Sequence, residues 1–367
     1  MAKVVLKDIS FKFENKLCVD KVNLEVEDKR CTVLLGPSGC GKTLILRMIA
    51  GLTNPTQGEI YIDERMVNDL DPADRGIAMM FQDYALFPHL TVFDNIAFPL
   101  KAIKMPKEEI KKRVDEVANF LHIEEFLYRY PTALSGGQQQ RVALGRTLVK
   151  RPLVFLLDEP LANLDAKLRV EMRGHLKRIQ QMLDITLLYV TNDQIDAQSI
   201  ADKIAIMREG KIEQIGSPEE IYKYPVNTFV ARFLGSPPIN FAEGRVKRKE
   251  ERLYLDTGDF LIPVSETTLG KILDEITQKE VIMGVRPECI KLAEKKEDMS
   301  FPAEVYFSQI QSSDVFIDLK IGKLVWRMKE QLDQISSLPG EGEKVWLKLV
   351  QGKLLFFNKS TGKRITG

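Results

Sequence analysis

Apolar runs of about five residues alternate with amphipathic stretches along the first 235 residues of the chain. The continuous apolar character of these runs is typical of strands that are buried on both faces of a mainly parallel sheet. Residues 105–121 are rich in lysine and glutamate, and apolar positions from Ile110 to Leu121 recur at helical spacing, which predicts an amphipathic helix. This alternation predicts an α/β layered domain. The runs expected as strands are VVLKDI, CTVLLG, IAMMF, LVFLLD, ITLLYV and KIAIM.

The pattern changes at the segment FLGSPPIN, residues 233–240. Its glycine and two prolines interrupt any continuing helix and mark a domain boundary. Beyond it, short β-like runs separated by turns predict a small barrel or a pair of barrel-like modules. We therefore predict two domains, residues 1–235 and residues 236–367. The β-like runs of the second domain are RLYLD, FLIPV, VIMGV, DVFIDLKI, KLVWRM, VWLKLV and KLLFF.

Net charge, the length of the apolar runs and the cysteine spacing limit which partners the chain binds and where in the cell it lies. The chain has 53 Lys plus Arg and 52 Asp plus Glu, a net charge of +1, so no global field recruits nucleic acid or anionic lipid. The longest apolar runs fall far short of the roughly 18 to 20 residues of a membrane span, and the start MAKVVLKDIS lacks the apolar core of a secretory signal. We therefore expect a cytoplasmic chain without membrane insertion. Its four cysteines form no CxxC pair and are expected to be reduced, non-ligating thiols.

The segment GPSGCGKT, residues 36–43, matches the phosphate-binding pattern GxxxxGK[ST]. It follows the strand-like CTVLL and precedes the helical pattern LILRMIAGL, which is the context that this loop requires; a chance glycine-rich turn is the alternative. Glycines let backbone amides converge on phosphate oxygens, and the helix start favours the anion. We expect Lys42 to reach the β and γ phosphates and the Thr43 hydroxyl to hold Mg²⁺. The expected ATP contacts are Gly36, Pro37, Ser38, Gly39, Cys40, Gly41, Lys42, Thr43 and Leu44.

The run LVFLLDE ends in two carboxylates, Asp158 and Glu159. A buried strand that delivers a carboxylate at its carboxyl end suits a magnesium-coordinating aspartate, and the next carboxylate can orient a water for attack on the γ phosphate. A strand that merely enters a solvated loop is the alternative for each residue alone. Together with the phosphate loop, the pair favours a nucleotide hydrolase.

The segment LSGGQQQRVALGRTL, residues 134–148, predicts a second helix that begins with small residues and free amides. One ATP does not need two such helix starts from a single chain, but in a head-to-tail pair the second could close over the γ phosphate of the partner. Here the chain resembles the ATP-binding cassette (ABC) family of transporter ATPases, whose signature is LSGGQ. The resemblance covers the first 235 residues and implies a P-loop NTPase cassette with a helical subdomain. It implies contact with the ATP of the partner by Ser135, Gly136, Gly137 and Gln138.

The same resemblance implies further roles. Gln82, in MMFQDYALFPHL, corresponds to the glutamine that senses magnesium and the attacking water and links the site to the membrane partner; an ordinary surface amide is its alternative. The segment ANLD, residues 162–165, resembles the loop that crosses the dimer interface, where Asp165 would lie. Phe13 stands where the family places an aromatic residue against adenine; a position in the core is its alternative, because Phe11 and Phe13 alternate as on a strand.

The tail resembles the transport-associated OB-type regulatory domain of importer ATPases. GSPPINF and GVRPECI are similar to segments of the carbohydrate-importer subgroup, although polyamine, sulfate and iron importers share much of this layout. The resemblance implies a homodimer that binds ATP and Mg²⁺ on the cytoplasmic face of the membrane. It also implies two separate transmembrane permease subunits and, indirectly, an extracellular solute-binding protein. In this arrangement no residue of the chain is expected to contact the transported solute.

Three positions depart from the family pattern. Asn192, in YVTNDQ, stands where the family has a histidine that contacts the γ phosphate; a harmless turn residue is the alternative. Leu44 replaces a hydroxyl residue after the phosphate loop, and Cys289 replaces a histidine of the tail. An asparagine amide donates hydrogen bonds but is shorter than imidazole and cannot become cationic. Three hypotheses follow: a homodimeric ATPase that drives an importer, a dimer that closes on ATP as a switch with little or no hydrolysis, and a cassette protein without a transport role.

Overall fold

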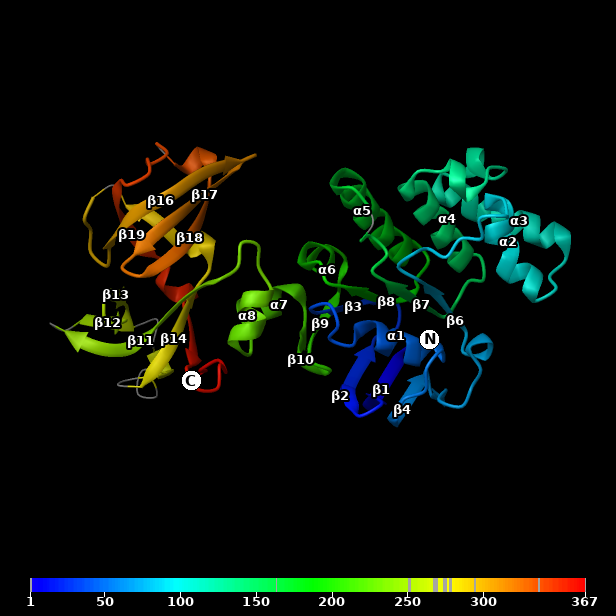
Figure 1. Ribbon diagram of the computed structural model, residues 1–367, viewed down its shortest axis with the longest axis horizontal. Helices are drawn as coiled ribbons and strands as arrows, with labels where there is room; N and C mark the ends of the chain where they lie inside the picture. The colour runs from blue at the N-terminus through cyan, green and yellow to red at the C-terminus, as the bar shows by residue number, and fades with distance from the viewer. Residues whose placement is uncertain are drawn as a thin grey trace. The chain divides into compact units, whose positions relative to one another are not determined.

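The computed structural model describes residues 2–162, 164–249, 252–266, 270–272, 276, 279–293, 295–335 and 337–366. The chain divides into two compact units, Met1–Glu219 and Glu220–Gly367 (Figure 1). Helix α8 (Thr228–Phe233) therefore belongs to the second unit, and the boundary expected at residues 235 and 236 lies just after it. Helix α7 (Pro218–Lys223) contains the division. None of the helices in the described ranges is long and apolar enough to span a bilayer.

A six-stranded sheet forms the centre of the first unit. Neighbouring strands pair in parallel from β9 to β6, and only β10 is antiparallel. Every residue of β3, β7 and β8 is buried, as expected for strands covered on both faces. Five of the six runs predicted for this sheet are confirmed. In spatial order the strands are β10 (Lys211–Gly216), β9 (Lys203–Arg208), β3 (Cys31–Leu35), β8 (Thr186–Thr191), β7 (Val154–Asp158) and β6 (Ile77–Met80).

The sixth run, VVLKDI, was assigned to the wrong sheet. It lies in β1, which pairs antiparallel with β2 and β4 in a separate four-stranded sheet. Lys7 and Asp8 interrupt its apolar character, and the strand mixes buried and exposed positions, as expected for a strand with one solvated face. Such half-buried strands are typical of antiparallel sheets. The strands of this sheet are β2 (Lys16–Val26), β1 (Val4–Phe13), β4 (Gln57–Ile62) and β5 (Arg65–Met66).

Three helices pack on one another beside the central sheet and form the predicted helical subdomain (Figure 1). The helix predicted over residues 105–121 is confirmed as α3 (Lys107–Leu121). It packs with α2 (Val92–Ala102) and α4 (Gly136–Leu148). The remaining helices of the first unit are α1 (Lys42–Ala50), α5 (Ala166–Met182) and α6 (Gln194–Ile200).

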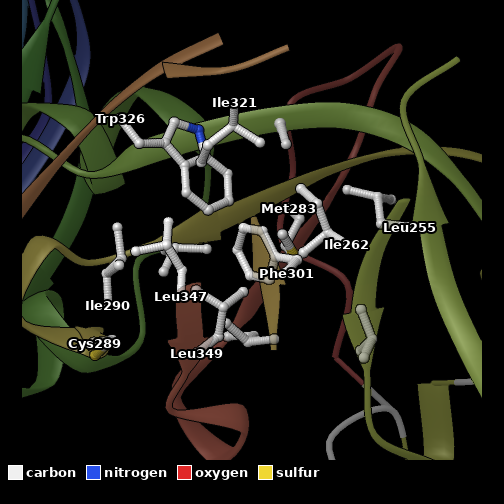
Figure 2. Packing of buried hydrophobic residues seen from close by; sticks show 14 of the residues in the cluster. Leu255, Ile262, Met283, Cys289, Ile290, Phe301, Ile321, Trp326, Leu347 and Leu349 are labelled. Atoms are coloured by element: carbon white, nitrogen blue, oxygen red, sulfur yellow. The ribbon is translucent and has the colours of Figure 1, made fainter. Parts of the chain in front are cut away.

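The second unit contains two five-stranded antiparallel sheets around one hydrophobic core. Met283 comes from one sheet, and Phe301, Trp326 and Leu347 come from the other (Figure 2). All seven predicted runs are confirmed as strands, whereas β11, β15 and β16 were not predicted. One sheet consists of β13 (Leu261–Val264), β12 (Arg252–Asp256), β11 (Asn240–Lys249), β14 (Glu280–Val285) and β20 (Leu355–Asn358). The other consists of β15 (Ile290–Ala293), β19 (Lys344–Leu349), β16 (Phe301–Gln311), β17 (Asp314–Ile321) and β18 (Leu324–Gln331).

The four cysteines, all within the described ranges, are free thiols, in agreement with the sequence. Cys289 is buried in the core of the second unit, and burial raises the pKa of its thiol to about 11. At neutral pH this side chain is therefore an uncharged packing residue.

Candidate nucleotide-binding site

The phosphate loop, residues 36–43, connects the buried strand β3 to helix α1. A side chain at Gly36 is excluded, because a Cβ there would lie 2.3 Å from the Met207 carbonyl oxygen. Gly41 precedes the helix at a φ of 110°, which side chains rarely adopt. The loop therefore depends on glycine at both positions, and it brings its main chain close to the first turn of α1.

Lys42, the first residue of α1, is only 4% exposed. Its ammonium donates to the carbonyl oxygens of Gly36 at 2.9 Å and Pro37 at 3.0 Å. A buried cation held by neutral carbonyls has no full counter-charge from these partners, so an anionic phosphate fits this position. Cys40 is buried beside it, and burial raises the pKa of its thiol. Leu44 packs against the core of the first unit.

Thr43 and Asp158 meet across the site. The Thr43 hydroxyl donates to Asp158 Oδ1 at 3.0 Å, and Asp158 is only 6% exposed. Burial raises the pKa of Asp158, against the opposing effects of the Thr43 hydrogen bond and of Arg47 and Lys42. A hydroxyl and a carboxylate oxygen are hard ligands of the kind that Mg²⁺ prefers. The donor set present therefore fits a magnesium ion.

Glu159 follows directly in a left-handed conformation, with a φ of 44°. Its amide donates to the Val190 carbonyl oxygen at 2.9 Å, which anchors the residue to strand β8. Burial is the main reason that the pKa of Glu159 is raised, and Asp158 raises it further. Gln82, which follows β6, has its Nε2 at 3.5 Å from Glu159 Oε2.

Asn192 lies just after β8 and is exposed. Its amide nitrogen lies 3.4 Å from the Ser38 hydroxyl oxygen in the phosphate loop. Each of these groups thus lies at or just after the carboxyl end of a strand. The phosphate loop follows β3, Gln82 follows β6, the Asp158–Glu159 pair ends β7, and Asn192 follows β8. In an open parallel sheet this edge is where ligands bind. The sequence predicted these residues separately, and the topology brings them to one edge.

The signature segment, residues 134–138, lies at the start of α4. Ser135 caps the helix in a reciprocal pair with Gln138: the Ser135 amide donates to Gln138 Oε1 at 2.9 Å, and the Gln138 amide donates to Ser135 Oγ at 3.4 Å. A Cβ added to Gly137 would lie 2.2 Å from Leu168, whereas one added to Gly136 meets nothing within 4 Å. Within the described ranges, no hydrogen bond joins this segment to the phosphate loop of the same chain.

Two residues that were predicted to contact adenine or the partner subunit, Phe13 and Asp165, are exposed to solvent. Phe13 is 63% exposed at the end of β1, which excludes the alternative of a core residue. Asp165 is exposed and caps α5, since its carboxylate accepts from the Leu168 amide at 3.0 Å. Asn163, within the predicted interface loop 162–165, lies outside the described residues.

The sequence analysis missed two residues of α4 that contact this site. Gln140 donates to the carbonyl oxygen of Pro160, which follows Glu159, and Arg146 donates to the carbonyl oxygens of Tyr84 and Ala85, which follow Gln82. One signal was present for Gln140: it lies four residues before the buried Leu144, so it is a polar residue on the apolar face of the helix.

Comparison with known proteins gives two family matches. Residues 19–162 match the model described as ABC transporter, and residues 235–290 match the model described as MalK OB fold domain. The second match lies within the β-rich unit and agrees with the OB-type domain predicted for the tail.

Two curated relatives and one solved structure are similar to this chain. The trehalose/maltose import ATP-binding protein MalK of Thermococcus litoralis is 45% identical over 380 residues, and the oligosaccharides import ATP-binding protein MsmX of Bacillus subtilis is 44% identical over 375 residues. Each alignment covers 100% of both chains. The dimeric post-hydrolysis structure of the ATP-binding cassette MJ0796 with ADP and Pi is 34% identical, with a TM-score of 0.53. It covers 58% of this chain and 98% of that chain.

Proposed function

Because the chain belongs to the ATP-binding cassette transporter family, we propose that it is the ATP-hydrolysing subunit of an importer for carbohydrates. The two full-length relatives, whose names describe import of trehalose/maltose and of oligosaccharides, support this solute class. An importer of the polyamine, sulfate or iron type is the alternative for the solute. The observation that carries the proposal is the junction of Thr43 and Asp158 beside the buried Lys42.

The proposed mechanism assigns one task to each residue. Lys42 and the amides of the phosphate loop bind the β and γ phosphates, while Phe13 stacks on adenine. Thr43, Asp158 and Gln82 would hold Mg²⁺, which would supply neutralisation of the charge on the phosphate oxygens. Glu159 orients the attacking water and accepts its proton, and its raised pKa makes the carboxylate a stronger base. The water oxygen bonds to the γ phosphorus as the bond to ADP breaks.

The second helix start acts on the nucleotide of a partner subunit. Ser135 and Gly136 are exposed at the start of α4, so a head-to-tail homodimer brings them onto the γ phosphate of the ATP that the partner holds. Gly137 and Gln138 complete this contact, and Asp165 lies at the same interface. Closure around two ATP molecules then drives the conformational change of two transmembrane permease subunits. An extracellular solute-binding protein delivers the solute to these subunits. The chain is peripheral on the cytoplasmic face of the membrane.

Asn192 replaces the histidine of the family at the γ phosphate. Its amide supplies a neutral donor, and the contact with Ser38 holds that donor at the phosphate loop. Loss of a transition-state donor typically reduces the rate by about 10² to 10³, but here a donor is exchanged rather than deleted. The alternative function is an ATP-gated dimer switch that hydrolyses little or no ATP.

Steady-state phosphate release by the purified chain tests the proposal. We expect magnesium-dependent ATP hydrolysis, and Asn192→His tests whether the amide limits the rate. A chain that dimerises with ATP but releases no phosphate, while Asn192→His does, is the ATP-gated switch. A chain that neither dimerises with ATP nor releases phosphate contradicts both functions.

A further inference from the structure

Helix α4 holds main-chain carbonyls on both sides of the proposed hydrolytic site. Gln140 Nε2 donates to the Pro160 carbonyl oxygen at 2.9 Å, one residue after Glu159. The Arg146 guanidinium donates to the carbonyl oxygens of Tyr84 at 2.7 Å and Ala85 at 2.6 Å, just after Gln82. One helix therefore fixes the two segments that carry Glu159 and Gln82.

Both segments adopt backbone conformations that need such support. The φ angles are 44° for Glu159, 59° for Tyr84 and 44° for Ala85, all in the left-handed region. Residues other than glycine are strained in this region and persist there only where the surrounding structure imposes the conformation. The hydrogen bonds from Gln140 and Arg146 act at these positions or next to them.

The burial of Gln140 is costly for the fold. Its side chain is fully buried, and its Oε1 has no hydrogen-bond partner in the described part of the chain. A buried amide with an unmade hydrogen bond destabilises a protein relative to an apolar side chain of similar size. The one hydrogen bond that Gln140 Nε2 makes is directed at the chain beside Glu159, which points to a role in positioning rather than in stability.

We propose that Gln140 and Arg146 are positioning residues for ATP hydrolysis. They hold the main chain at the positions from which the side chains of Gln82 and Glu159 come within 3.5 Å of each other, so that both can contact one water. The inference rests on the proposed function, and it assigns to α4 a second task besides the contact of its first turn with the ATP of the partner. Because misplacement of a catalytic group by about 1 Å costs about 10²-fold in rate, loss of either tie lowers kcat.

Kinetics of Gln140→Met and Arg146→Lys in the full chain test this role. Methionine keeps the length and burial of Gln140 without the donor, and the compact lysine ammonium cannot replace the planar fork across two carbonyls. We expect kcat to fall by about 10- to 100-fold while KM for ATP changes by less than about threefold. The double variant should lose less than the product of the single losses, because both ties act on one pair of side chains.

Thr147→Val is the matched control, since Thr147 is a buried polar residue of α4 whose hydroxyl donates only within the helix, to Ala143 and Leu144. MgADP binding counts the folded sites in each preparation. A kcat per folded site equal to that of the control, or a loss confined to KM, overturns the inference. If a variant does not fold, Gln140→Leu and Arg146→Gln replace it, with the same expectation.

A wild-type chain without phosphate release defeats the proposed function but not this inference. Amide hydrogen exchange at residues 82–87 and 159–162 then tests the positioning role, because the hydrogen bonds of Gln140 and Arg146 exist without turnover. We expect exchange about tenfold faster in the two variants than in Thr147→Val. Equal exchange rates in all three variants overturn the positioning role.

Discussion

Thr43 and Asp158 lie 115 residues apart in the sequence and are joined by a 3.0 Å hydrogen bond. Thr43 is in the first turn of α1, and Asp158 is the last residue of the buried strand β7. The bond closes the phosphate loop against the sheet and places side by side the two oxygens to which the proposed function assigns Mg²⁺. Hydrolysis and magnesium dependence should therefore fail together when this pair is changed.

Asp158→Asn removes the charge and keeps an oxygen that accepts the Thr43 hydrogen bond. We expect kcat to fall by at least about 10²-fold, because phosphoryl transfer depends on a metal ion held against the phosphates. Binding of ATP should also lose most of its dependence on magnesium. Titration of ATP with magnesium and with EDTA, on wild type and variant, measures this. A variant that still binds MgATP more tightly than free ATP, by the wild-type ratio, contradicts the ligand role of Asp158.

Glu159→Gln should trap a dimer that has ATP bound. The amide keeps the size of the side chain but no longer accepts a proton from water, so ATP holds the interface closed without being consumed. Size-exclusion chromatography with saturating MgATP measures the dimer fraction, and MgADP is the control. A variant that stays monomeric with ATP contradicts the head-to-tail sandwich.

The parts of the site that were predicted are those whose chemistry is local in the sequence. The spacing of GPSGCGKT contains both its turn and its helix start, and the strand that ends in Asp158 and Glu159 can be read from one apolar run. The contacts of Gln140 and Arg146 could not be predicted in this way. The contact of Gln140 joins residues that are 20 positions apart in the sequence, and those of Arg146 join residues that are 61 and 62 positions apart. Only the packing of α4 determines these contacts.

The wrong assignment of VVLKDI has a similar cause. Lys7 and Asp8 lie inside this run between apolar residues, and the choice between the two sheets depends on which face is covered by distant elements. In the second unit β12 and β17 alternate between a core face and a less buried face, which is the pattern that predicts a strand in an antiparallel sheet. The unpredicted β15 is only four residues long, and one of its residues is buried.

Gly36→Ala should abolish nucleotide binding. The new methyl group would lie 2.3 Å from the Met207 carbonyl oxygen, so either the loop or β9 must move. We expect a stability loss of about 1–3 kcal/mol from this overpacking. Gly174→Ala is the control, since it is exposed in α5 with open space around it and should gain about 0.5–1 kcal/mol from helix propensity. Thermal unfolding and a nucleotide-binding titration measure both; normal ADP affinity in Gly36→Ala contradicts the assignment of the loop.

Asp94 should make the stability of the first unit depend on acid pH. The hydrogen bond from Lys101, together with that from Thr91, lowers the pKa of this carboxyl below its ordinary value of 3.8. The ionised form therefore stabilises the folded chain above pH 3.8, and this contribution is lost as the pH falls toward the folded pKa. The pair is partly solvated, which limits the effect to under about 1 kcal/mol. Urea unfolding of wild type and Asp94→Asn should differ at pH 6 and converge near pH 3; an equal difference at both contradicts it.

Arg286 should determine the stability of the second unit without affecting hydrolysis. Its guanidinium is 4% exposed and donates to the carbonyl oxygens of Ala231 at 2.9 Å, Leu234 at 2.6 Å and Tyr222 at 2.9 Å. These bonds tie the segment that contains α8 to the β-rich sheets. A lysine ammonium cannot span the three acceptors, and the unpaired buried carbonyls make Arg286→Lys cost roughly 2–4 kcal/mol.

The exposed Arg245, which pairs with Glu280, provides the comparison for Arg286. Arg245→Lys should cost less than about 1 kcal/mol, because exposed ion pairs contribute little. Calorimetry of both variants should show a lower Tm for the second unit only in Arg286→Lys, with phosphate release per folded chain equal to wild type. Equal transitions in the two variants would mean that the three carbonyl contacts do not hold residues 220–235 to this unit, and the predicted boundary at residue 235 would then describe the cooperative domain better.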